Sequence, residues 1–259
     1  MRAHRIVGVL STAVVAMMVA ATVSVVPASA AAAPTVKMAS PTWKVGSTFH
    51  EGDYDHYQFG EAATEVFHWT VSAYSSPVCA QEFDADHHDD GVYSSAVAKG
   101  SRSFTENYEL DQYGQNDTVT VTFCNGVSVT SNVVTPYIRA LDDADTTNVS
   151  YLGAWSVSTC KCAIEGTTHY SSQKNASYSF RVSGAFGLAM SKAPNRGSAA
   201  VYVDGLKTAV INTYASTAIN ATFVYSIALS GTATHTVSVV NLATPGHPRI
   251  DLDAIALHY

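Results

Sequence analysis

Short runs of alternating apolar and polar residues, separated by turn-forming pairs, fill most of the chain after the first thirty or so residues. In EVFHWTVSAY, which begins at Glu65, Phe67, Trp69 and Val71 share one face and mostly polar side chains share the other. Side chains of a strand point alternately to opposite faces, so this period of two predicts a strand with one face in a core. No amphipathic helix is evident beyond the N-terminal segment, and an all-β fold is predicted.

The first half of the chain predicts one β-sandwich. In DTVTVTFCNGVSVTSNVV, two strands at 118–124 and 127–133 flank Asn125-Gly126, a pair that tolerates the positive φ angles of a type I′ hairpin turn. Further strands are expected near 35–43 and 101–110. Together these features predict an immunoglobulin-like or fibronectin-like sandwich over residues 31–137.

The second half predicts a different sandwich. TPYIRALDDADTT is polar and does not alternate, so we place a domain boundary near residue 137. A second hairpin is expected to turn at Asp204-Gly205. The number of short strands expected in this half is typical of a jelly roll, which is predicted over residues 138–259. The expected strands are 177–182, 185–190, 199–203, 209–214, 223–228, 235–241 and 249–258.

The N-terminal segment has the features of an export signal. Arg2 and Arg5 precede an apolar run from Ile6 to Val26, and PASA then offers small residues for cleavage after Ala30. The apolar run is also long enough to span a bilayer, which leaves a membrane anchor as the alternative. We therefore expect residues 1–30 to be a signal peptide and the mature protein to be secreted to the extracellular space. No membrane insertion is expected after cleavage.

Net charge excludes some partners. Removal of Arg2 and Arg5 with the signal leaves 12 basic and 21 acidic residues, a net charge of −9. Phosphate backbones are bound by clustered Lys and Arg, so nucleic acid is not an expected partner.

Four cysteines in an exported chain are expected to be oxidised, and four allow three pairings. In an immunoglobulin-like sandwich, the loops expected to carry Cys79 and Cys124 lie at the same end, so a bridge between them is plausible within one domain. Either of the other pairings would link the two predicted domains twice. The remaining bridge then joins Cys160 and Cys162.

Cys160 and Cys162 lie one residue apart in TCKCAIEG. A bridge across one residue needs a tight turn, and we expect it to be a local staple on a loop. Two alternatives stay open. One is a redox-active disulfide, since strained bridges are easily reduced, and the other is a soft-metal site that includes His169.

DADHHDDG, at residues 84–91, is the densest polar segment. Its carboxylates suit Ca²⁺, and His87 and His88 suit a transition metal. However, adjacent histidines on an extended chain point to opposite faces, and the carboxylate spacing is not that of an EF-hand loop. A solvated loop is the preferred interpretation, and metal binding stays open.

Hydrolase signatures are missing from the chain. It contains no G-x-S-x-G, no H-E-x-x-H and no glycine-rich phosphate loop. We therefore expect a protein that is not an enzyme. A small hydrolase whose site is assembled from residues distant in sequence remains an alternative.

A series of segments in the second half resembles a known family. LDDADTTNVSYLGAW, NASYSFRVSG, NRGSAAVYVDG, THTVSVV and RIDLDAIAL occur in the order typical of a galactose-binding-like jelly-roll domain. This carbohydrate-binding-module type is common at the C-terminus of secreted proteins from high-GC Gram-positive bacteria. The resemblance covers residues 141–259. Relatives commonly have a Gly-Gly pair where this chain has CKCAIEG.

The resemblance implies a carbohydrate site and a metal site. Aromatic faces stack on sugar rings and guanidinium groups bind hydroxyls, so Trp155, Tyr170 and Arg196 are the candidate carbohydrate-binding residues. Trp155 is alternatively a core residue, because YLGAW reads as a strand with alternate residues buried. Relatives often hold a structural Ca²⁺ between the first segment and the last strand, which here implicates the carboxylates of Asp142 or Asp143 together with Asp253. Alternatively, Asp253 caps neighbouring backbone amides inside the sandwich.

The sequence thus predicts a non-catalytic, secreted binding protein. Its expected partner is an extracellular glycan or another cell-surface component, bound through the C-terminal jelly roll. A structural or adhesion protein that binds another protein is the second hypothesis, and the small hydrolase is the third.

Overall fold

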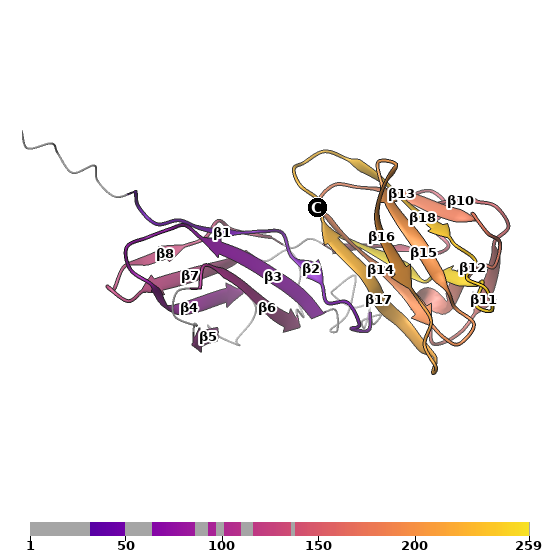
Figure 1. The fold of residues 1–259 in the computed structure, drawn as a ribbon, viewed down its shortest axis with the longest axis horizontal. Helices are drawn as coiled ribbons and strands as arrows, with labels where there is room; N and C mark the ends of the chain where they lie inside the picture. The colour runs from indigo at the N-terminus through magenta and orange to yellow at the C-terminus, as the bar shows by residue number, and fades with distance from the viewer. Residues whose placement is uncertain are drawn as a thin grey trace, which may run out of the picture. The chain divides into compact units, whose positions relative to one another are not determined.

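The computed structural model describes residues 32–49, 64–85, 93–96, 101–109, 116–135 and 138–258. These residues form strands and one short 3-10 turn, which confirms the all-β class (Figure 1). Every pairing between strands is antiparallel. Residues 33–259 form one compact unit.

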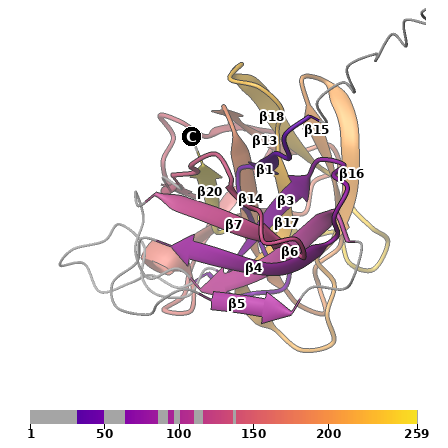
Figure 2. The same cartoon turned by 90° about the vertical axis from the view of Figure 1, so that its left-hand side faces the viewer.

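The described residues of the first half form two four-stranded sheets, and Figure 2 shows β4, β5 and β7 side by side. In the first sheet β3 pairs with three strands: β1, β2 and β6. In the second sheet the order is β5-β4-β7-β8. The bounds are β1 Val36–Met38, β2 Thr42–Trp43, β3 Thr64–Val71, β4 Val78–Ala85, β5 Tyr93–Ala96, β6 Ser103–Glu109, β7 Asp117–Phe123 and β8 Ser128–Thr130.

The core between these two sheets is the one that the alternation predicts. Phe67, Trp69 and Val71 of β3 are all buried, and the ring of Phe67 lies 4.9 Å from that of Phe83 on β4. The predicted Cys79–Cys124 bridge is present, with the two Cα atoms 5.0 Å apart. It joins the start of β4 to the turn after β7 and spans 45 residues of sequence.

The two predicted hairpin turns differ in type. At Asp204-Gly205 both residues have positive φ, 50° and 78°, as a type I′ turn requires. At Asn125-Gly126 only Gly126 does, at 84°, so the type I′ prediction is wrong there. Phe123 pairs with Val127 across three residues, and a loop of that length uses a type I turn followed by one left-handed residue.

Three sheets make up the second half. Their strand orders are β10-β13-β18-β15-β16, β11-β12-β19 and β17-β14-β20-β9. The bounds are β9 Ile138–Asp142, β10 Ser150–Leu152, β11 Ser156–Thr159, β12 Thr167–Ser171, β13 Ser177–Val182, β14 Ala185–Lys192, β15 Ser198–Val203, β16 Leu206–Asn212, β17 Ile219–Ala228, β18 His235–Asn241, β19 Ile250–Leu252 and β20 Ala254–His258, with the 3-10 turn η1 at Ile164–Gly166. Eighteen buried apolar residues form the main core between these sheets.

Most predicted strands of the second half are present, and β13 and β18 have the predicted bounds. The last predicted strand is divided at Asp253 into β19 and β20, because the Asp253 amide donates to Ala189 and its side chain is buried. The polar segment before residue 142 contains β9, which the missing alternation did not predict. β9 pairs with β20 along its whole length.

Residues 43–49 cover one face of the sheet β17-β14-β20-β9. Trp43 is 1% exposed, and its ring stacks on Phe223 of β17 at 5.7 Å and on His258 of β20 at 4.2 Å. Phe49 packs beside it, 5.2 Å from Phe223. A Cβ on Gly187 of β14 would lie 2.8 Å from the Phe223 ring and 2.9 Å from that of Trp43. Glycine at 187 therefore allows these rings to approach the sheet.

We predict that Trp43→Ala lowers the free energy of unfolding by about 3–5 kcal/mol, because it leaves a cavity over β14, β17 and β20. The measurement is urea denaturation followed by fluorescence and circular dichroism. Val45→Ala is the control, since Val45 is 59% exposed and close in sequence, and it should change stability by about 0.5 kcal/mol or less. Equal losses in the two variants would contradict this packing.

Candidate functional site

The three-stranded sheet β11-β12-β19 has two chemically different faces. Tyr170 of β12 is opposite Asp251 of β19, and His169 is opposite Leu252. Directly opposed residues point to the same face, and neighbours along a strand point to opposite faces. Leu252 belongs to the main core, so His169 lies on the core side, and Tyr170 and Asp251 lie on the outer side.

Trp155 belongs to the core-side group. Its ring lies 5.1 Å from Tyr151 and 5.8 Å from Tyr178, and its indole N–H donates to the Leu152 carbonyl at 3.1 Å. The ring of Tyr151 stacks in turn on His169 at 4.7 Å. Trp155 is half-buried, which matches the alternative that it packs at the core edge.

Asp143 is fully buried in the same region, and both of its carboxylate oxygens have a hydrogen-bond partner. One carboxylate oxygen accepts from the Thr167 hydroxyl at 2.8 Å, and the other lies 2.6 Å from Nδ1 of His169. The Tyr151 hydroxyl donates to the backbone carbonyl of Asp143 at 2.6 Å. Burial, followed by the charges of Asp143 and Asp142, raises the pKa of Tyr151.

Asp142 and Asp253, in contrast, each keep one buried oxygen without a hydrogen bond. The other oxygen of Asp142 accepts from the Ala144 amide at 3.0 Å, and that of Asp253 accepts from the Ile164 amide at 2.8 Å. Burial is the main cause that raises the pKa of Asp142 to about 6 and that of Asp253 to about 7. The charge of Asp143 adds to the shift of Asp142, and the charges of Asp251, Asp143 and Asp142 add to that of Asp253. These residues, Asp142, Asp143 and Asp253, are named the carboxylate cluster.

The loop that carries Cys160 and Cys162 positions the amide that binds Asp253. The two cysteines are bridged, as predicted, with Cα atoms 5.0 Å apart, and no described cysteine is free. Glu165 and Gly166 both have positive φ, 52° and 78°, which returns the chain into β12. The Cys160 amide donates to Gly166 at 2.9 Å and closes the loop.

Within the described ranges, no group of three or more His, Cys, Asp or Glu side chains is arranged to hold a metal ion. Of the carboxylate cluster, Asp142 and Asp253 offer free oxygens, and Asp143 does not. Residues 86–91 of the DADHHDDG segment, with His87 and His88, lie outside the described residues. The prediction for that segment stays untested.

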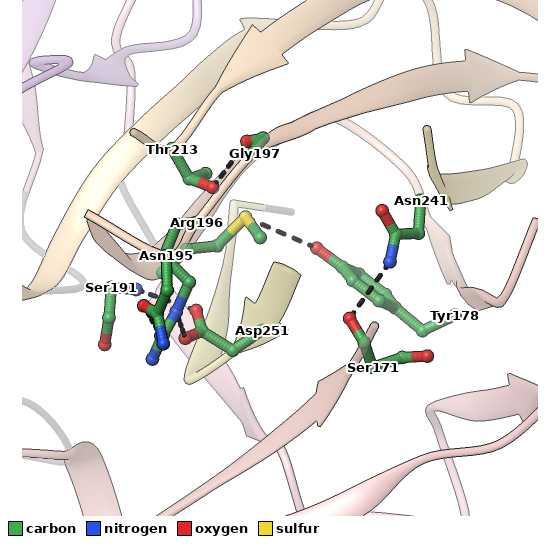
Figure 3. A network of polar contacts seen from close by, with 10 residues as sticks. Ser171, Tyr178, Ser191, Asn195, Arg196, Gly197, Thr213, Asn241 and Asp251 are labelled. Carbon is green, nitrogen blue, oxygen red and sulfur yellow. Dashed lines mark hydrogen bonds and ion pairs between the residues drawn. The ribbon is translucent and has the colours of Figure 1, made fainter. Parts of the chain in front are cut away.

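On the outer side of the three-stranded sheet, Arg196 is paired with Asp251. The distance from Nε to the carboxylate is 2.6 Å, and Asp251 is fully buried while Arg196 is 9% exposed (Figure 3). The second oxygen of Asp251 accepts from the Ser191 amide at 2.9 Å. Burial raises the pKa of Asp251, and the charges of Arg196 and Arg249 act against that rise. The predicted carbohydrate residue Arg196 is therefore not at an open rim.

Arg249 lies beside this pair and was not predicted from the sequence. Its guanidinium carbon is 3.7 Å from the centre of the Tyr170 ring, and its backbone forms a bridge with Arg196. Burial, followed by repulsion from Arg196, lowers the pKa of Arg249. The four residues Tyr170, Arg196, Arg249 and Asp251 are named the guanidinium cluster.

An exposed aromatic residue borders the loop 193–197 that carries Arg196. Tyr214 is 44% exposed, and its ring lies 4.8 Å edge-on to His247. Nδ1 of His247 forms a short hydrogen bond with the Pro194 carbonyl. Glycine at 197 allows the loop 193–197 to approach the segment around His247, since a Cβ there would lie 2.0 Å from the His247 carbonyl oxygen.

Of the three predicted carbohydrate residues, the structure brings Tyr170 and Arg196 into one cluster and places Trp155 in the core-side group. The alternation in RIDLDAIAL was the available signal for Arg249 and Asp251, since residues 249 and 251 share a face of the strand. Their partner Arg196 comes from a loop more than fifty residues earlier, and no sequence pattern links the two.

A hydrolase site would need a catalytic base and a nucleophile in hydrogen-bond contact. His169 and the buried Asp143 form the kind of pair that orients a catalytic base. Among the described residues no hydroxyl hydrogen-bonds to the other ring nitrogen of His169. The hydroxyl of Thr167, which shares Asp143 with His169, donates to the Asp143 carboxylate instead.

No family model and no curated protein matches the sequence. Among solved structures, the chain is similar to the CBM36-1 domain of a multidomain xylanase from the hindgut metagenome of Trinervitermes trinervoides. The identity is 14% and the TM-score 0.35, over 46% of this chain and 95% of that domain. A family 35 carbohydrate-binding module from Clostridium thermocellum matches at 14% identity and a TM-score of 0.35, over 45% and 96%.

A longer match is to an exo-beta-1,3-galactanase from Phanerochaete chrysosporium. The identity is 11% and the TM-score 0.36, over 86% of this chain and 57% of that enzyme. At these identities and TM-scores the matches carry no argument about function, which rests on the geometry of the site.

We predict that, with a chelator present, the free energy of unfolding falls as pH rises from about 4 to about 7. The pKa of Asp253 is 3.8 for an ordinary carboxyl and about 7 in the folded state, so between these values the folded chain binds more protons than the unfolded chain. Asp253→Asn should reduce the slope in urea denaturation at a series of pH values, and the remaining slope should come mainly from Asp142, whose pKa is raised to about 6.

Asp204→Asn is the control for this measurement. A hydrogen bond from His235 is the main cause that lowers the pKa of Asp204, so its titration lies below the same window. This variant should keep the wild-type slope. An unchanged slope in Asp253→Asn would show that this carboxyl does not titrate as described.

Proposed function

We propose that this chain is a secreted, non-catalytic binding protein whose C-terminal half recognises an extracellular carbohydrate or cell-wall glycan. The observation that carries the proposal is a set of residues, named the loop group, that consists of the loop 193–197, Tyr214 and the guanidinium cluster. It combines the exposed aromatic ring of Tyr214 with the planar donors of the guanidinium cluster. Sugars present apolar C–H faces that pack on aromatic rings, and hydroxyls that accept hydrogen bonds from guanidinium groups.

Secretion is supported by the chemistry of the chain. Residues 1–30 have the organisation of an export signal, and all four cysteines are paired as expected for an oxidising compartment. No helix of the described residues is long and apolar enough to cross a bilayer.

The proposal predicts that the purified protein is retained on at least one insoluble extracellular polysaccharide and that Tyr214→Ala weakens this binding about tenfold. The measurement is a depletion isotherm against a panel of polysaccharides, with circular dichroism to check the fold. Leu206→Ala is the matched control, because Leu206 is 75% exposed on β16 and lies outside the loop group. A folded protein that binds none of the panel would contradict the proposal.

We further propose that the carboxylate cluster binds Ca²⁺. Asp142 and Asp253 supply carboxylate oxygens that have no partner, which is the donor type that Ca²⁺ prefers. A bound cation would compensate the repulsion that raises both pKa values. Its contribution would be structural, since it would hold β9 and the loop 160–166 against the start of β20.

Calcium at about a hundred times its dissociation constant should raise the free energy of unfolding by about 2.7 kcal/mol. The measurement is thermal unfolding at pH 7.5 with added CaCl₂ after chelation, with MgCl₂ at equal concentration as the ion control. Asp253→Asn should abolish the effect, and Asp204→Asn should keep it. A melting temperature that does not respond to CaCl₂ would exclude the site.

One observation favours the second candidate function, adhesion to another protein. β16 is an edge strand, and its Leu206 and Val210 are 75% and 55% exposed. Exposed apolar side chains of this kind are found at protein-binding surfaces. If a Leu206→Ala variant lost cell-surface binding while Tyr214→Ala retained it, adhesion would replace glycan recognition as the function.

A further inference from the structure

The guanidinium cluster contains more positive than negative charge. Arg196 and Arg249 are both cationic, and Asp251 is the carboxylate that they share. Asp251 is the one carboxylate among the described residues whose charge acts on Arg249, and Arg196 shares it, so no second carboxylate balances Arg249. A local excess of one positive charge is unusual here, since the chain as a whole is acidic.

Arg249 also has unused hydrogen-bonding capacity. Its Nε is buried without a partner and is closed to a ligand at the surface. The side chain as a whole is half-buried, and no hydrogen bond to a described residue holds its two terminal nitrogens. Tyr170 holds one face of the guanidinium at 3.7 Å, which leaves the terminal nitrogens to a ligand. Tyr170 thus supports an arginine on this face, in place of the sugar ring expected from the sequence.

Arg249 is pre-organised by its surroundings. Its backbone carbonyl accepts from the Gly197 amide at 2.9 Å, and β19 begins at the next residue. Burial and the adjacent Arg196 lower its pKa, so a ligand that brought negative charge would relieve an existing repulsion. Guanidinium forks bind planar or tetrahedral oxyanions through two parallel hydrogen bonds.

The geometry points to the guanidinium cluster as an anion-binding subsite that accepts a carboxylate or phosphate group of an acidic extracellular glycan. The anion takes the free donors of Arg249, and the adjoining sugar extends over the loop 193–197 toward Tyr214. This inference rests on the proposed function and specifies its ligand class. Asp251 stays bound to Arg196 and balances one of the two positive charges, so the charge of Arg249 remains for the anion.

Isothermal titration calorimetry with three probes of equal length tests the inference: an oligogalacturonide, a poly(glycerol phosphate) oligomer and a neutral galacto-oligosaccharide. The full-length mature protein should bind one or both anionic probes about tenfold or more tightly than the neutral one, since charge-assisted hydrogen bonds exceed neutral ones by this amount. The carboxylate and phosphate arms identify which oxyanion is preferred.

Arg249→Gln should abolish the preference for the anionic probe, and Lys207→Gln should keep it. Lys207 is exposed on β16, so its substitution removes the same charge away from the cluster. Arg249→Lys keeps the charge but loses the planar fork, and it should reduce the preference several-fold. If circular dichroism shows that Arg249→Gln does not fold, the result for Arg249→Lys decides the test in its place.

Two results would overturn the inference while leaving glycan recognition intact. One is equal affinity for the neutral and anionic probes, and the other is the same loss in Arg249→Gln and Lys207→Gln. If the protein binds none of the probes and no polysaccharide of the wider panel, the proposed function fails and the anion subsite fails with it.

Discussion

Asp251 is a fully buried carboxylate that joins three segments of the C-terminal half. It accepts from the Ser191 amide and from the Arg196 guanidinium, and it lies in β19 directly opposite Tyr170. Loss of one partner from such a pair leaves an uncompensated buried charge, which costs about 3–5 kcal/mol. The position of Arg196 in its loop therefore depends on this carboxylate, and the charge of Asp251 also acts on the neighbouring Arg249.

Asp251 and Asp253 lie two residues apart and have opposite electrostatic surroundings. Asp251 is matched with a guanidinium group at 2.6 Å, while Asp253 has only the Ile164 amide and keeps one oxygen unpaired. The short segment 249–253 therefore borders a cation-rich cluster at its start and an anion-rich cluster at its end. The first suits an anionic ligand and the second a cation, so one strand end can serve binding and structural stability together.

The aromatic residues fall into groups that differ in what packs against their rings. Trp43, Phe49 and Phe223 are buried and cover the sheet that contains β14 and β20. Trp155 and Tyr151 pack at the edge of the main core. Tyr170 carries Arg249, and Tyr214 is the ring left exposed beside the loop 193–197. The presence of an aromatic residue does not by itself indicate a sugar-stacking site, because a ring face covered by another side chain is closed to a sugar.

Local information in the sequence was sufficient for the all-β class and for strands such as β13 and β18, because strand alternation and hairpin turns depend on near neighbours. The two disulfides were predicted from the expected sandwich topology, which made the other pairings less plausible. The resemblance, and not local pattern, suggested Tyr170, Arg196 and the three carboxylates as site residues, and those roles stay predictions. Local pattern did not predict β9, whose residues do not alternate, or the Asn125-Gly126 turn type. The Arg196–Asp251 pair, the stacking of Arg249 on Tyr170 and the free oxygens of Asp142 and Asp253 were decided by tertiary structure alone. Each joins segments far apart in sequence, and the charge and burial around a side chain are set only when those segments meet.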